Sequence, residues 1–294
     1  LISQSFDSLD IRCFLPYLCQ AQTLYELGRF NQADAIYQKA GKSIGYNSSD
    51  FDDFTKVKNY QYFKHWIYTK IKIIYGIGKE EELSNEVIDL YRYLISFEQF
   101  LQERFAHTKS NYLYAEQSKI FYEELIAILV SQDPVENIDE IYRLMSRLKY
   151  SKIFQGLNNT MDSLYYGVPA KILNDLEITQ DSLHALSQNQ QKDIVSTRYS
   201  IFELRVDSIM SVLREEYPEY VNMRYGYDHV PTDSLVSWSG QNGTSIVEYF
   251  YGDSAVYAIL IDNGSPKIYE LCKPVQLDKD VQMWLALLHN PSSN

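Results

Sequence analysis

A thiol and an imidazole are the two side chains through which this sequence could perform nucleophilic chemistry. Cys272 ends an apolar run, and His289 ends a predicted helix further along the chain. A thiolate attacks a carbonyl carbon while a neighbouring imidazole moves the proton, so the two would form a dyad if the fold brought them together. The alternatives are that Cys272 is a small buried apolar side chain and that His289 is a cation at a helix C-terminus. We expect no catalytic residue in this chain.

Metal and cofactor sites are not predicted either. No two histidines, and no histidine with a cysteine, have the spacing of metal ligands on a helix. The histidines other than His289 are His65, His107, His184 and His229. The segment Gly76-Ile77-Gly78-Lys79 lacks the preceding strand and the spacing of a phosphate-binding loop, so it is predicted to be a turn between helices. We therefore expect no cofactor.

The composition indicates a folded, acidic protein. Of the 294 residues, 45% are hydrophobic and 14% aromatic, with 26 tyrosines, which is enough for a buried core. The 27 Lys and Arg residues stand against 39 Asp and Glu residues, a net charge of −12. This charge opposes binding to nucleic acid or to an anionic membrane surface. No apolar run approaches the ~20 residues of a membrane span.

The cysteines favour a reducing compartment. Cys13, Cys19 and Cys272 are few and form no CxxC pair, so neither a disulfide framework nor a zinc site is expected, and a cytoplasmic location fits. The chain begins at Leu1 rather than Met, so a signal segment that was removed before Leu1 remains an alternative.

The elements that would position any site are mainly helices. Small and apolar residues near the start have the spacing of a helix–turn–helix repeat, in which small side chains let two helices approach and a glycine allows the turn. These residues are Ala21, Leu24, Gly28, Phe30, Ala33, Tyr37 and Ala40. An ordinary αα-hairpin is the alternative. Gly45 and Asn47 are predicted to end the second helix.

Two further hairpins and a long helix pair are predicted after this unit. The hairpins pair 55–75 with 80–97 and 111–130 with 135–154, and Pro134 suits the first turn of a helix. After a break at Gly167-Val168-Pro169, helices are predicted over 170–191 and 193–216. The alternative to a functional role is that they form a coiled-coil-like pair with no catalytic residues. Their apolar stripes are Ile172, Leu173, Leu176, Leu183 and Leu186, and Ile194, Ile201, Leu204, Ile209 and Leu213.

The pattern changes after residue 220. A short helix capped by Thr232 or Asp233 is predicted through Trp238, with Gly240 stopping it. Three short runs rich in β-branched and aromatic residues follow over 246–251, 255–261 and 267–271, each closed by a turn signal, and they predict adjacent strands joined by tight turns. A last helix is predicted over 277–289, with Asp278 as its cap.

Two features of these strands bear on what covers them. Glu248 is a carboxylate within an apolar strand, so it either pairs with a basic or backbone partner in a buried place or lies on a solvent face. Apolar residues alternate onto both faces of the middle strand, which is typical of a sheet buried on both sides. One helix cannot cover such a sheet, so we expect this chain alone to leave an apolar face or a strand edge exposed.

Several of these segments together resemble one known family. The stretch Ile246–Leu271, the Tyr217-Pro218-Glu219-Tyr220 run followed by a short strand-like run, and Ser151-Lys152-Ile153-Phe154 are similar to parts of CHAT-domain proteins. In these proteins a caspase- and separase-like domain follows an array of tetratricopeptide (TPR) repeats. The resemblance covers the chain from end to end, most strongly over 212–272 and least over 46–130. It also implies a bacterial source.

The resemblance implies an α+β, mostly helical fold. We expect TPR-like repeats over 1–158, a helical linker pair over 159–222, and the N-terminal α/β part of a CHAT domain over 223–294. The family's peptidases use a histidine in a His-x-x-x-His-Gly motif and a cysteine in a Ser-Ala-Cys motif. Neither motif occurs here, and both lie beyond this region in the family. The chain is thus expected to stop before the catalytic half.

Two functions follow from the resemblance. In the first, the repeats bind a protein or peptide partner and regulate a caspase-like cysteine peptidase half joined to this chain. In the second, the protein is a non-catalytic scaffold or adaptor with a degenerate CHAT domain. A protein partner is expected in both, whereas nucleic acid and membrane are not.

Overall fold

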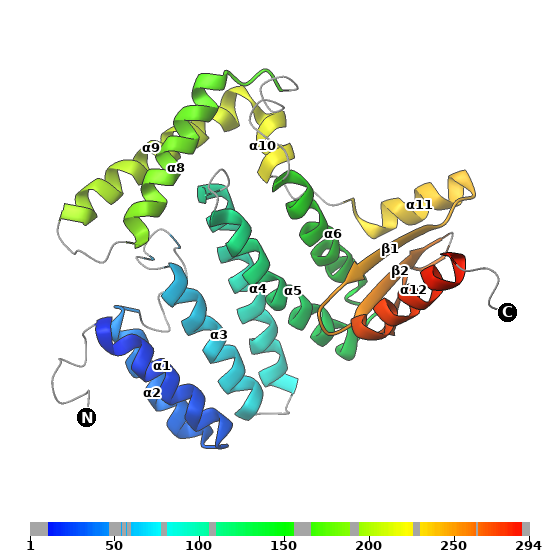
Figure 1. Cartoon of the computed structure of the whole chain (residues 1–294), viewed down its shortest axis with the longest axis horizontal. Coiled ribbons are helices and arrows are strands. Elements are labelled where there is room, and N and C mark those ends of the chain that lie inside the picture. Colours follow the sequence, from blue (N-terminus) through cyan, green and yellow to red (C-terminus); the bar gives the residue numbers. More distant parts are fainter. Residues whose placement is uncertain are drawn as a thin grey trace. The chain divides into compact units, whose positions relative to one another are not determined.

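The structure is a computed structural model that describes residues 11–46, 54, 57, 60–77, 81–105, 110–155, 166–188, 194–225, 230–262 and 264–289. It is mostly helical with a small antiparallel sheet, which confirms the α+β, mostly helical class (Figure 1). The chain forms two compact units. Unit 1 comprises Leu1–Thr108 and Thr179–Val206, and unit 2 comprises Lys109–Ile178 and Asp207–Asn294.

Unit 1 begins with the predicted hairpin. Helices α1 (Phe14–Glu26) and α2 (Phe30–Ser43) pack along each other and are joined at Gly28, whose φ of 71° is the left-handed conformation that glycine tolerates. Ala21 and Ala33 are fully buried, as their small size predicted. Gly45, with φ 81°, follows the end of α2, while Asn47 lies outside the described residues. The hairpin agrees with both the repeat and the ordinary αα-hairpin interpretations.

Helices α3 (Tyr60–Ile77) and α4 (Glu81–Phe105) continue unit 1, each packing on its predecessor where contacts are described. Their core with α2 is aromatic. The Tyr37 and Trp66 rings stack with centroids 5.1 Å apart, and Phe63 meets Phe97 edge-on at 4.8 Å. Trp66 also fills the space beside Gly41, where an added Cβ would lie 2.6 Å from a ring carbon. Glycine is therefore required there by close approach.

A charged pair lies inside this apolar core. Lys64 on α3 and Glu98 on α4 form an ion pair, with side chains only 4% and 0% exposed. Burying two charges costs desolvation energy that the attraction between them only partly returns. The pair therefore joins α3 to α4 at one fixed register.

Unit 2 contains the helical hairpin of α5 (Ser110–Gln132) and α6 (Ile138–Gln155). Asp133 organises the turn between them, since its carboxylate accepts the backbone N–H groups of Val135 and Glu136 at 2.9 and 3.0 Å. Pro134 lies in this turn rather than in the first turn of α6, which corrects the expectation for it. Within the described part of 1–157 every regular element is a helix, as predicted.

The long helices α8 (Ala170–Gln188) and α9 (Ile194–Glu216) each contribute residues to both units. The predicted stripe of α8 is confirmed at Leu173, Leu176 and Leu183, which are fully buried. The predicted stripe of α9 is wrong in its middle, because Ile201 and Leu204 are exposed. Leu213 is buried as predicted, and Val206 and Met210, which were not in the predicted stripe, are also buried in the described part of α9.

Two short helices precede the sheet. Helix α10 (Pro218–Tyr225) has Pro218 at its first position. The strand-like run implied after Tyr220 therefore begins as helix, and residues 226–229 lie outside the described residues. Helix α11 (Thr232–Asn242) passes through Gly240 and ends at Gly243, whose φ is 58°. Neither Thr232 nor Asp233 caps it, since the residue before the helix is Pro231. Thr232 instead bonds to another element, described below.

The sheet is an antiparallel meander in the order β1–β2–β3, with strands Ile246–Tyr251, Val256–Ile261 and Lys267–Cys272. The three runs therefore lie where they were predicted. Directly paired residues share a face of the sheet. The inner face holds Ile246, Glu248 and Phe250 opposite Ile261, Ile259 and Tyr257, and the outer face holds Val247, Tyr249 and Tyr251 opposite Leu260, Ala258 and Val256.

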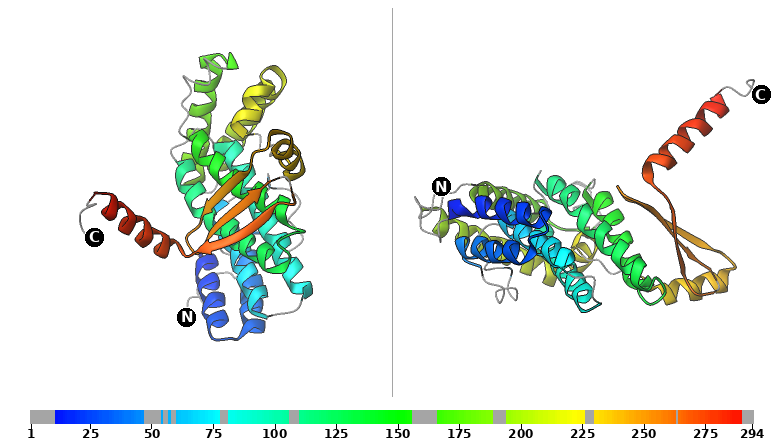
Figure 2. Two further views of the ribbon diagram at one scale, coloured as in Figure 1. Left: turned by 90° about the vertical axis from the view of Figure 1, so that its right-hand side faces the viewer. Right: turned by 90° about the horizontal axis from the view of Figure 1, so that it is seen from below.

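Helix α12 (Pro274–His289) follows β3 after a single residue and projects away from the sheet (Figure 2). It begins at Pro274, earlier than predicted, so Asp278 lies inside the helix and is not its cap. Its apolar side chains are largely exposed, among them Val281, Trp284 and Leu285. Among the described residues, no helix combines the length and apolarity needed to cross a bilayer.

Candidate functional site

Cys272 and His289 cannot act together in this fold. Cys272 is half-buried at the end of β3, directly before α12, and His289 is the last residue of α12. A rise of 1.5 Å per residue over this helix separates its two ends by roughly 22 Å. A catalytic pair must lie within hydrogen-bonding reach. The expectation that they form no dyad therefore has a geometric reason, which is the rigid helix between them.

The other histidines are dispersed. His65 lies on α3, where desolvation and then the charge of Lys64 lower its pKa. His184 lies on α8, where burial lowers its pKa against the opposing charge of Asp181. His107 and His229 fall outside the described residues. In the part of the chain that the structure describes, no group of three His, Cys, Asp or Glu side chains is arranged to hold a metal ion.

The polar side chains that do converge join the sheet to the α5–α6 hairpin. The first such contact, which we call the turn anchor, consists of Lys119 and Glu123 on α5 and Asp253 in the β1–β2 turn. The Glu123 carboxylate accepts the backbone N–H of Asp253 at 2.6 Å and lies 3.4 Å from the ammonium of Lys119, which also pairs with the Asp253 carboxylate. The Glu123 side chain is only 7% exposed. The turn is therefore held by a buried charge.

Gly252 explains why the turn can approach α5 so closely. An added Cβ there would lie 2.7 Å from the carbonyl oxygen of Ala255 and 3.0 Å from the carboxyl carbon of Glu123. The backbone N–H of Gly252 donates to the same Ala255 carbonyl at 3.0 Å and closes the turn. A side chain at this position would thus push the carboxylate of Glu123 away from the Asp253 N–H.

The turn anchor alters proton affinities around it. Burial alone lowers the pKa of Lys119, but its hydrogen bond to Asp253 and the charge of Glu123 outweigh this effect and raise the pKa above its ordinary value. The pKa of Tyr257, on the adjoining strand β2, is raised by burial and then by the carboxylates of Glu270 and Glu123. Both shifts favour the protonated forms, the ammonium of Lys119 and the neutral phenol of Tyr257.

A second contact joins the inner face of the sheet to α6. Lys149 on α6 lies 2.5 Å from the carboxylate of Glu248 on β1. Glu248 thus has the basic partner that one of its two interpretations required, and its side chain is 20% exposed rather than fully buried. Lys149 is half exposed, so this pair is screened by solvent far more than the turn anchor is.

A third contact fixes α11. The Asp139 carboxylate on α6 accepts both the backbone N–H of Thr232 at 2.9 Å and its hydroxyl at 3.1 Å. Asp139 thus satisfies a donor at the N-terminus of α11 and takes the place of the side-chain cap expected within the helix itself. The three contacts together attach both the helix before the sheet and the first strand to a single helical hairpin.

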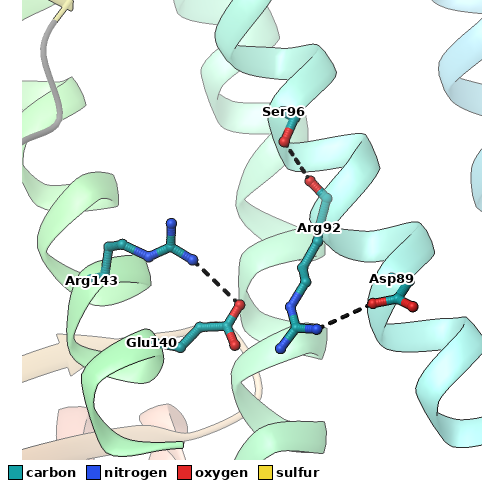
Figure 3. Close-up of polar contacts among 5 residues, drawn as sticks. All are labelled: Asp89, Arg92, Ser96, Glu140 and Arg143. Carbon is teal, nitrogen blue, oxygen red and sulfur yellow. Dashed lines mark hydrogen bonds and ion pairs between the residues drawn. The ribbon is translucent and has the colours of Figure 1, made fainter. Parts of the chain in front are cut away.

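Exposed ion pairs elsewhere contribute little by comparison. Arg92 pairs with Asp89 within α4, and Arg143 pairs with Glu140 within α6, each three residues apart (Figure 3). The Ser96 hydroxyl donates to the Arg92 carbonyl in the same helix. Such pairs stabilise single turns by at most about 1 kcal/mol. Each of these two pairs lies within a single helix.

Sequence reasoning found Glu248 but missed the turn anchor and Asp139. Gly252-Asp253 was interpreted only as a turn signal, and Lys119 and Glu123 were not singled out within the helix predicted over 111–130. A signal was nevertheless present. Glu123 lies between Tyr122 and Glu124 in a helix with apolar residues on either side of this pair, and a carboxylate that such a helix buries must find a partner.

The comparisons with known proteins identify no relative. A scan against protein-family models, a search of curated proteins and a search of solved structures each found no match to this chain. The functional argument therefore depends on the residues and contacts described above.

Proposed function

We propose that this chain is the regulatory part of a CHAT-type cysteine peptidase. Its helices act as TPR-like repeats that receive a protein or peptide partner, and its three strands open a caspase-like α/β domain whose catalytic half is joined to this chain in cis. The resemblance of 212–272 to that family supports the proposal, together with a chain order in which helical hairpins precede the sheet. The reducing cytoplasm is its proposed location.

The observation that carries the proposal is the turn anchor. A regulator must connect the surface that binds a partner to the domain that it controls. The α5–α6 hairpin is directly attached to the sheet by the buried Glu123, by Lys149 and by Asp139. A displacement of α5 relative to α6 would pull the β1–β2 turn and the start of α11 in different directions. The anchor thus supplies a physical route from repeats to sheet.

The alternative is a non-catalytic scaffold. One observation favours it for this chain taken alone, which is the separation of Cys272 from His289 by the full length of α12. In that function the same anchors would only hold the sheet rigid, and the repeats would present a groove to a partner.

The coding sequence after Asn294 discriminates the two functions. A strand ending in His-Gly followed by one ending in a Ser-Ala-Cys-like motif supports the peptidase, and the absence of both refutes it. The regulatory claim needs a second experiment in the intact gene product. Glu123→Ala should change the dependence of peptide hydrolysis on the partner while leaving partner binding intact. Glu215→Ala, an exposed carboxylate on α9, is the matched control.

A further inference from the structure

We infer that the outer face of the sheet and the apolar stripe of α12 form a self-association surface, in which α12 of one copy lies on the sheet of a second copy. The outer face comprises Val247, Tyr249 and Tyr251 on β1, and Tyr269 on β3, with the middle strand between them. The stripe comprises Leu277, Val281, Trp284 and Leu285, which recur at the spacing of one helix face. This inference does not depend on the proposed peptidase.

The edge strands of the outer face and the α12 stripe carry exposed apolar side chains, whereas Val256 and Ala258 on the middle strand are 2% and 5% exposed. Tyr249 is 57% exposed and Tyr269 45%, and the ring of Trp284 is 64% exposed. Figure 2 shows the sheet with α12 projecting from it, and no helix of the described part of unit 2 lies over the outer face. Scattered exposed apolar residues are ordinary, but a continuous aromatic face beside an uncovered apolar helix is typical of an interface.

The exposed area supplies a large part of what a stable dimer requires. At about 200 Å² per aromatic side chain, the exposed fractions of Tyr249, Tyr251, Tyr269 and Trp284 amount to roughly 400 Å². This is about half of the ~800 Å² per partner in a standard interface. The aliphatic members of the two surfaces supply further area, since Val247, Val281 and Leu285 are also exposed. In a two-fold arrangement each copy gives one helix and receives one, so both surfaces are buried at once.

The connection to α12 argues against the helix covering its own sheet. Lys273 alone joins β3 to α12, whereas a strand and helix that fold back on each other are usually joined by about 2–6 residues. The Tyr251 hydroxyl also donates to the Asp278 carboxylate at 2.9 Å, which fixes the first turns of α12 at the end of β1. While this contact holds, α12 projects from the sheet instead of lying along it (Figure 2).

Charge permits the approach of two copies at this surface. The chain carries a net charge of −12, so most faces of two copies repel each other. The outer face, by contrast, pairs Lys267 with Leu260 and Tyr269 with Ala258, and its paired positions include no carboxylate. The α12 helix also carries Asp280 near its start, a charge that complements Lys267 on the receiving sheet. A second copy thus fits in both polarity and charge.

Sedimentation velocity of the purified chain between about 2 and 100 μM tests the inference at concentrations where dimers of this interface size form. The wild type should be a dimer over the upper part of this range, and Val281→Asp should be a monomer because it places a carboxylate in the stripe. Val135→Asp is the matched control, since Val135 is an exposed valine in the α5–α6 turn and its change should leave the dimer intact. A wild-type monomer, or a dimer that survives Val281→Asp, would overturn the inference.

Cross-linking separates exchange between copies from folding back within one copy. A photoreactive benzoylphenylalanine replaces Trp284 in a ¹⁵N-labelled chain, which is mixed with unlabelled chain and irradiated. The inference predicts cross-links between labelled α12 peptides and unlabelled peptides of 246–272. Cross-links confined to one labelled copy would show that α12 closes over its own sheet and would refute the exchange, as would cross-links to peptides outside the sheet.

Discussion

Removal of the Glu123 carboxylate is the perturbation whose size the structure defines best. Glu123 is nearly buried, accepts the Asp253 N–H at 2.6 Å and lies 3.4 Å from Lys119. Hydrogen bonds to charged groups contribute about 1.5–3 kcal/mol, and the side chain has little solvent to replace its partners. Glu123→Ala should therefore destabilise the β1–β2 turn by about 2 kcal/mol.

The Glu248–Lys149 pair offers an internal comparison. It joins the same two structural parts, but Lys149 is half exposed and the pair is screened by solvent. Pairs of this kind contribute about 0–1 kcal/mol. Glu248→Ala should consequently cost less than half of what Glu123→Ala costs, although both variants remove one carboxylate facing a lysine.

Hydrogen exchange followed by mass spectrometry measures the local opening that each variant promotes. Because 1.4 kcal/mol corresponds to a factor of ten, Glu123→Ala should accelerate exchange in peptides covering 246–261 by roughly 10- to 100-fold and Glu248→Ala by less than about 5-fold. Glu215→Ala, exposed on α9, should leave these peptides unchanged. Equal acceleration by the first two variants, or a larger effect of Glu248→Ala, would refute the argument that burial makes the turn anchor strong.

Three further outcomes are expected. Ala33→Phe should lower the free energy of unfolding by roughly 1–3 kcal/mol in urea titrations, because Ala33 is fully buried between α1 and α2. Ala35→Phe, on the exposed side of α2, should change it by less than about 0.5 kcal/mol. Equal effects would place Ala33 outside the contact between α1 and α2. Burial and then Asp34 raise the pKa of Tyr37 well above 10.0, so the stability that its neutral phenol contributes is complete below pH 10.0 and is lost as the pH rises above it. In melting experiments between about pH 9.5 and 11, Tyr37→Phe should therefore lose less stability than the wild type. Identical losses in the two proteins would contradict this. A thiol reagent should label exposed Cys19 faster than half-buried Cys272. The purified chain should hydrolyse no peptide. Peptide hydrolysis that is abolished by alkylation of Cys272 would overturn the expectation of an inactive chain.

The sequence predicted elements best where one local cause determined them. Ala21, Gly28 and Ala33 marked the first hairpin because small size and a left-handed φ are needed there and few residues supply them. The three strands were bounded by turn residues on both sides, so the sheet segments were placed within one residue. Each of these signals is local in the chain and does not depend on what packs from elsewhere.

Elements determined by distant partners were predicted less well. The stripe on α9 was misplaced because Ile201 and Leu204 look like core residues, and only the packing of the whole chain decides which face of the helix is buried. Thr232 was expected to cap its own helix, but Asp139, far away in sequence, supplies the acceptor. The turn anchor joins α5 to a turn more than a hundred residues later, and no local pattern links Glu123 to Asp253.

The central proposal is that this chain regulates a caspase-like cysteine peptidase joined to it. Peptide hydrolysis by the intact gene product, with and without replacement of the downstream motif cysteine by alanine, tests it most directly. The proposal predicts hydrolysis by the wild-type product and its loss in the alanine variant, because the thiolate is the nucleophile. Hydrolysis that survives the replacement, or a downstream sequence with neither the His-Gly nor the Ser-Ala-Cys motif, would contradict it.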